Sequence, residues 1–121
     1  MATRGVRGAT TVTRDEERPI LEATKELLTA LVAANGINPE DVAGIFFTVT
    51  EDLSAAFPAK AARFMGWEQV PLMDAREIPV PGSLPRCIRV MLLWNTSRAQ
   101  EEIVHVYQRD ARRLRPDLAA G

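Results

Sequence analysis

The sequence contains few of the side chains on which covalent and metal-dependent catalysis rely. Its 121 residues include one cysteine, Cys87, and one histidine, His105. A single thiol excludes a disulfide within the chain, and one thiol with one imidazole cannot complete a Cys/His zinc site. Cys87 lies in an apolar run, and His105 lies between two valines. We therefore interpret them as a core thiol and a hydrogen-bonded sheet residue, not as a nucleophile and a base.

Targeting segments and cofactor motifs are missing as well. No apolar run approaches the ~20 residues needed to cross a bilayer, and the N-terminal MATRGVRGATT lacks the apolar core of a signal peptide. The sequence has no GxGxxG, GxxxxGK[ST], HExxH or GxSxG motif and no repeat. We expect a soluble, cytoplasmic protein that needs no cofactor or metal. At ~100–200 residues per domain, the chain is expected to form one domain over residues 1–121.

The charge is balanced in number but not in residue type. There are 15 Lys+Arg against 16 Asp+Glu, and the formal charge of −1 argues against nucleic-acid binding. Thirteen of the basic residues are arginine, and the two lysines are Lys25 and Lys60. A forked guanidinium suits carboxylates and phosphates. Codon bias in a high-GC genome is the favoured explanation of the overall excess, so the count decides nothing and only the positions of the arginines can indicate a function.

Hydrophobic patterning predicts alternating strands and helices. Apolar residues at helical spacing predict a long helix from about Glu17 to Ala34, ended by Asn35-Gly36. A short helix over 57–64 is expected between proline and glycine signals. Runs of β-branched and apolar residues predict strands at Arg4–Val12, Ala43–Thr50, Gln69–Asp74 and Arg86–Trp94. After them we expect a helical turn at 99–103, a short strand at 104–108 and a loose basic tail from about residue 112.

This order of elements is typical of an α/β domain. We predict a five-stranded mixed sheet packed on one long helix, with a proline-rich loop at Ile78–Pro85. One helix cannot cover both faces of such a sheet. We therefore expect the uncovered face to meet another subunit in a homo-oligomer.

Two groups of cations stand out by position. Arg89 lies within the most apolar strand, where an unpaired charge is costly, so it pairs with either a protein carboxylate or an anionic ligand. Lys60 and Arg63 are three residues apart and share one helix face, which is either an anion-facing surface or a solvated one. Together with Arg7, Tyr107 and Glu77, these residues suit a polyanionic small molecule and electrostatic catalysis.

The motifs RGVRGATTV, FPAKAAR, EIPVPGSLPRCIRV and HVY…LRPDL, in this order and spacing, resemble the monofunctional chorismate mutases of the AroH type. The resemblance runs from about Arg4 to Leu118. It implies a homotrimer of pseudo α/β-barrel architecture with active sites between neighbouring subunits. The implied reaction is the rearrangement of chorismate to prephenate in phenylalanine and tyrosine biosynthesis, and chorismate is the implied small-molecule partner.

The resemblance also implies roles for individual residues. Arg7 and Arg89 match arginines that bind the substrate's ether oxygen and a carboxylate, and Glu77 matches a carboxylate that contacts the ring hydroxyl. Tyr107 matches a residue that hydrogen-bonds the side-chain carboxylate. The residues that the neighbouring subunit contributes to the site are matched by Phe57, Lys60 and Arg63. A mobile residue that closes the site is matched by Arg115.

Asp74 departs from the pattern, because the family frequently has a cysteine or another small residue there. A second carboxylate could repel a dianion, accept a hydrogen bond from the substrate hydroxyl or pair with an arginine. Two other functions stay open from the sequence. One is an enamine/imine deaminase of similar trimeric fold, and the other is a non-catalytic sensor of an aromatic-pathway carboxylate.

Overall fold

The computed structural model describes residues 1–115, and its centre is a mixed sheet with the strand order β3-β2-β4-β1-β5. β4 pairs antiparallel with both β1 and β2, while β3 and β5 extend the two edges in parallel pairings. The strands are β1 (Ala2–Thr11), β2 (Val42–Val49), β3 (Leu72–Arg76), β4 (Cys87–Thr96) and β5 (Val106–Tyr107). The helices are α1 (Glu17–Asn35) and α2 (Ala59–Phe64), with short 3-10 helices at Pro39–Asp41, Gln100–Glu102 and Arg109–Arg113. The predicted five-stranded α/β architecture is confirmed.

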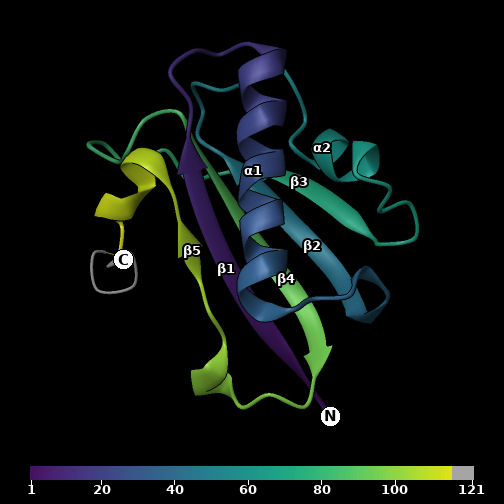
Figure 1. Cartoon of the computed structure of the whole chain (residues 1–121). Coiled ribbons are helices and arrows are strands. Elements are labelled where there is room, and N and C mark those ends of the chain that lie inside the picture. The colour runs from purple at the N-terminus through teal and green to yellow at the C-terminus, as the bar shows by residue number, and fades with distance from the viewer. Residues whose placement is uncertain (116–121) are drawn as a thin grey trace.

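Helix α1 lies across one face of the sheet, as Figure 1 shows. Its apolar stripe at helical spacing is buried, and Gly36 ends the helix in the left-handed conformation with φ of 73°. Leu27 and Leu31 approach β1 where Gly8 has no side chain, because a Cβ at Gly8 would lie 3.1 Å from each leucine. The helix therefore seats closely against the strand that carries Arg7.

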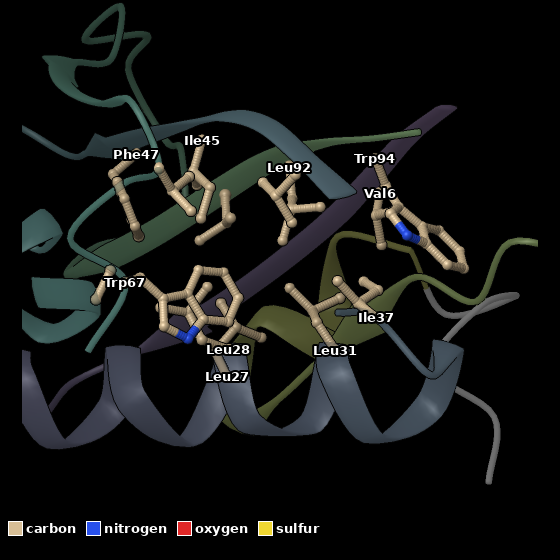
Figure 2. Close-up of a cluster of buried hydrophobic side chains, with 14 of the residues drawn as sticks. Val6, Leu27, Leu28, Leu31, Ile37, Ile45, Phe47, Trp67, Leu92 and Trp94 are labelled. Atoms are coloured by element: carbon tan, nitrogen blue, oxygen red, sulfur yellow. The ribbon is translucent and has the colours of Figure 1, made fainter. Parts of the chain in front are cut away.

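The main core fills the space between α1 and the sheet. Figure 2 shows leucines of α1 facing apolar side chains of β1, β2 and β4, with Trp67 closing one end. Burying each such side chain stabilises the fold by about 1.5–3 kcal/mol. Trp67 and Trp94 are both buried in this cluster, which confirms that they pack in the core.

The opposite face of the sheet is open in the single chain. Successive residues of β4 alternate, so Ile88, Val90 and Leu92 are buried, whereas the Arg89 side chain is 45% exposed. The expectation that Arg89 is enclosed in a buried strand is therefore wrong for the single chain. β4 is indeed central, but only its α1 side is covered by the chain itself. Phe46 and Met73 remain 46% and 59% exposed on the same open side as Arg89.

Several boundaries differ by a few residues from the sequence-based prediction, and three of the differences concern the edge strands and the tail. β3 begins after Pro71, later than the expected Gln69. β5 is shortened to two residues because the backbone of Val104 bonds the Asn35 side chain on α1 instead of β1. The expected loose tail from about residue 112 is wrong in its first part, because a 3-10 helix spans Arg109–Arg113. The part of that predicted tail from Pro116 on, which includes Pro116–Leu118 of the LRPDL motif, lies outside the described residues.

No helix among the described residues combines the length and apolar character needed to span a bilayer. The cytoplasmic location and the single-domain organisation expected from the sequence stay predictions.

Candidate active site

Two arginines and a tyrosine from three neighbouring strands surround a pocket on the open face of the sheet. The pocket has a volume of about 220 Å³. We call it the arginine pocket, and its lining residues are Arg7, Gly8, Ala9, Phe46, Thr48, Arg89, Val90, Met91 and Tyr107. Sheet register explains how distant residues meet there, because Ala9 of β1 and Thr48 of β2 both stand opposite Arg89. The structure thus brings together Arg7, Arg89 and Tyr107, as the sequence predicted.

Glu77 joins this group through an ion pair. Its Oε2 lies 3.1 Å from Nε of Arg89, and the Glu77 side chain is 15% exposed. Of the two partners left open for Arg89, the protein carboxylate is therefore present. A guanidinium carries several N–H donors, so one carboxylate oxygen does not exhaust it and an anionic ligand can bind as well. This ion pair with Glu77 fixes the orientation of the Arg89 side chain.

Thr48 is a functional candidate that the sequence reasoning missed. Its hydroxyl donates a 2.7 Å hydrogen bond to Oε2 of Glu77, the same oxygen that faces Arg89. A threonine in a strand is expected from β-propensity alone, so no local signal distinguishes this one. Its role follows from the register that places it opposite Arg89.

Tyr107 reaches the arginine pocket from the edge of the sheet. β5 pairs with β1 through Gly8 to Val106 and Ala9 to Tyr107. Tyr107 is buried in a small cluster with Ala9, Ala111 and Leu84, the last of which belongs to the proline-rich loop. The short edge strand and that loop therefore support the tyrosine from two sides.

Arg115 lies near the same edge. Its positive charge acts on His105, where it helps lower the pKa of the imidazole. The structure thus places Arg115 near His105, and Arg115 does not line the arginine pocket. The motif-based expectation of a closing role for Arg115 stays a prediction.

Phe57, Lys60 and Asp74 line a different hollow, formed with Glu17, Val49 and Arg76 and with a volume of about 580 Å³. Lys60 is engaged within the chain, because its Nζ lies 2.9 Å from Glu17 and 5.5 Å from the ring centre of Phe64. Phe57 is 68% exposed, and Arg63 is exposed without lining either hollow. The single chain therefore does not bring the FPAKAAR helix to the arginine pocket.

Asp74 holds the beginning of α2. Its Oδ1 accepts a 3.0 Å hydrogen bond from the backbone N–H of Ala59. Partial burial raises the pKa of Asp74 above 3.8, and this is opposed by the Ala59 N–H and by the charge of Arg63. Of the alternatives raised by the sequence, attraction to an arginine is thus present in the structure.

Cys87 is a buried free cysteine. Burial raises the pKa of its thiol to about 11, against the opposing effect of Arg89. A thiol with that pKa is deprotonated in only about one molecule in a thousand at pH 8, so it is a poor nucleophile. The prediction of an inert core thiol is confirmed.

This state of Cys87 gives a simple test. An aromatic disulfide reagent at pH 8 should label the native protein only on the time scale of unfolding, while the denatured protein should react at once. Labelling of the native protein to one equivalent within minutes would contradict the assigned environment.

The site offers cations, a hydrogen-bonded carboxylate and a phenol for recognising a small anion. Among residues 1–115 no three potential metal-ligating side chains gather. The chemistry that these residues can perform is binding, orientation and electrostatic stabilisation of negative charge.

Comparisons with known proteins agree with the motifs. The family model described as chorismate mutase type I matches residues 3–118. The chain is 59% identical to chorismate mutase AroH of Thermus thermophilus over 119 residues, covering 98% of each protein. It is 48% identical to chorismate mutase AroH of Bacillus subtilis over 120 residues, covering 98% of this chain and 94% of that one. A solved chorismate mutase from Clostridium thermocellum superimposes with a TM-score of 0.88 at 48% identity, covering 89% of this chain and 96% of that structure.

Proposed function

The chain belongs to the type I chorismate mutases and converts chorismate to prephenate, and we propose that Arg7, Arg89, Glu77 and Tyr107 are its own contribution to the substrate site. Neither the deaminase nor the sensor alternative is favoured by these relatives. The observation that supports the proposal most strongly is the convergence of Arg7, Arg89 and Tyr107 on one pocket, with Glu77 paired to Arg89.

The reaction explains why such a site suffices. Chorismate is a dianion, and its rearrangement breaks a C–O ether bond while a C–C bond forms within the same molecule. No proton transfer and no nucleophile is required. The protein has to hold the enolpyruvyl arm over the ring and to stabilise the negative charge that develops on the ether oxygen.

Arg89 is suited to the second task. It stands on the central strand, and its guanidinium is directed by Glu77, which is itself held by Thr48. A cation fixed in this way stabilises developing charge without the reorganisation that water needs. Arg7 on the neighbouring strand and Tyr107 on the edge strand bind the carboxylates and so favour the reactive conformation.

The arginine pocket is too small to be the whole site. Its volume of about 220 Å³ lies below the roughly 300–1,000 Å³ typical of small-molecule sites. The open face beside it exposes Phe46 and Met73, and the exposed Phe57 and Arg63 lie outside it. These features support a homotrimer in which Phe57, Lys60 and Arg63 of each neighbour complete the pocket.

Asp74 has a supporting part in this arrangement. Its bond to the Ala59 N–H and its attraction to Arg63 hold α2, from which the neighbour's Arg63 extends. Asp74 lines the same hollow as Phe57, which is one of the residues proposed to complete the neighbour's substrate site. In that position Asp74 can accept a hydrogen bond from a substrate hydroxyl. Arg115 closes the β5 side of the pocket when substrate binds.

A direct assay tests the function. Purified protein incubated with chorismate should remove the absorbance of chorismate and form an equal amount of prephenate. Release of ammonia from an imino acid would indicate a deaminase instead, and tight binding of chorismate without turnover would indicate a sensor.

Thr48 provides a test of the Glu77 arrangement. In Thr48→Val the half-buried Glu77 carboxylate loses one hydrogen bond, worth about 1 kcal/mol, so kcat/KM should fall roughly fivefold. Thr48→Ser keeps the hydroxyl and serves as the matched control, with kcat/KM close to the parent value. A loss in Thr48→Ser with none in Thr48→Val would show that methyl packing, not the hydrogen bond, is what matters at this position.

A further inference from the structure

His105 is the one histidine of the chain, and the reaction described above gives it no part. Its Nδ1 accepts a 2.9 Å hydrogen bond from the backbone N–H of Arg7. This bond continues the pairing of β1 with β5, which otherwise consists of Gly8 with Val106 and Ala9 with Tyr107. An imidazole nitrogen thus acts where a backbone carbonyl would act in a longer strand.

We propose that His105 is a positioning residue that fixes Arg7 relative to Tyr107 through this hydrogen bond, and that it does so only as the neutral imidazole. The inference rests on the proposed placement of Arg7 and Tyr107 in the substrate site. Both residues line the arginine pocket from adjacent strands. Since β5 is only two residues long, one added bond is a large part of what holds these strands together.

The protonation state matters because Nδ1 is the acceptor. Protonated histidine carries a hydrogen on both ring nitrogens and cannot accept the Arg7 N–H. Partial burial, followed by the charges of Arg7 and Arg115, lowers the pKa of His105 below 6.5. The α1 side chain that reaches this segment is the neutral Asn35, which bonds the backbone of Val104. Among the described residues, the charges that act on the imidazole come from Arg7 and Arg115 and are positive, so they add to the effect of burial in favouring the neutral form.

The direction of the pH effect follows from linkage. The unfolded chain binds a proton at His105 near pH 6.5, and the folded chain binds it only at lower pH. Between the two values the unfolded state holds more protons, so the free energy of unfolding decreases as the pH falls through this window. The strand contact and the position of Arg7 are lost at the lower end of this window, where the folded chain itself takes up the proton.

Substrate binding should in turn change the pKa of His105. A dianion in the arginine pocket binds best while Arg7 is held in place, and the neutral imidazole is the form that holds it. By reciprocity the bound dianion favours the neutral form, so the pKa of His105 should fall further when the pocket is filled, and the Arg7 N–H should become better protected from exchange.

Nuclear magnetic resonance of ¹⁵N-labelled protein reads this contact directly, since there is one histidine to assign. Without ligand we expect the neutral form protonated at Nε2, a pKa below 6.5 and slow exchange of the Arg7 amide. Addition of prephenate should lower the pKa of His105 further. A neutral form protonated at Nδ1, or an unprotected Arg7 amide, would overturn the proposal while leaving the chorismate mutase function intact.

Substitutions separate positioning from packing. His105→Asn carries an acceptor close to the place of Nδ1, whereas the acceptor of His105→Gln lies close to the place of Nε2 and is the matched control. We expect His105→Asn to keep kcat/KM at pH 7.5 and to lose the acid-side decline that histidine imposes. His105→Gln and His105→Leu should lose about tenfold in kcat/KM.

Wild-type kcat/KM and a wild-type pH profile in His105→Leu would overturn the proposal. A turnover-competent enzyme in which prephenate moves neither the Arg7 amide resonance nor the pKa of His105 would instead show that Arg7 is not at the substrate, and the inference would fail with that placement.

Discussion

Replacing Arg89 by citrulline, which has the shape of arginine without its charge, should lower kcat by ~10²–10³-fold, or roughly 3–4 kcal/mol of transition-state stabilisation. KM should change far less, because the other cations still bind the carboxylates of the substrate. The reason is that the ether oxygen becomes negative only as the C–O bond breaks, so the missing charge is felt mainly in the transition state. Steady-state kinetics with chorismate at several concentrations separates the two parameters.

Arg4→Gln is the control for this experiment. Arg4 lies on β1 like Arg7 but faces away from the pocket, with its guanidinium bonded to the carbonyl of Arg98. Its kinetics should match those of the parent. If the Arg89 variant kept its kcat and only KM rose, Arg89 would be a binding residue and not the group that stabilises the transition state.

Mixing two inactive variants should restore activity. An Arg63→Ala protein has an intact arginine pocket, and an Arg89→Gln protein has an intact α2 surface. In randomly exchanged trimers from an equal mixture, about one quarter of the sites combine both intact parts, so activity should recover to roughly a quarter of the parent value. Chorismate turnover before and after subunit exchange measures this recovery.

The matched control is a mixture of Arg7→Gln with Arg89→Gln. Both residues line the same pocket of one chain, so no hybrid contains an intact site and activity should stay low. Recovery in the control equal to that of the Arg63 mixture, or no recovery in either, would contradict a site shared between subunits.

Most of the fold could be predicted because local patterns and tertiary structure agree. The apolar stripe of α1 and its terminal glycine set that helix, and the apolar run of β4 makes it the central strand. The predicted extent of β5 was wrong because a side chain took the place of a backbone hydrogen-bond partner. Asn35 binds the backbone of Val104 and shortens β5, which no periodicity in residues 104–108 can indicate.

The site could be predicted only in part. The position of Arg89 in an apolar strand drew attention to it, but its exposure depends on which face of the sheet lacks a second layer. Thr48 and His105 carry no local signal, because their roles arise from sheet register and from one hydrogen bond to a residue far away in sequence. The family resemblance supplied the proposed roles of Glu77 and Arg63, which spacing alone does not reveal.

The central claim is that Arg89 acts on the transition state more than on the ground state, and the affinity for a transition-state mimic tests it most directly. A bicyclic ether dicarboxylate locked in the reactive shape should bind the citrulline variant more weakly by the same ~10²–10³ factor as the loss in kcat/KM. The affinity for prephenate should change much less. Undiminished binding of the locked ether by a variant with a strongly reduced kcat would contradict the account.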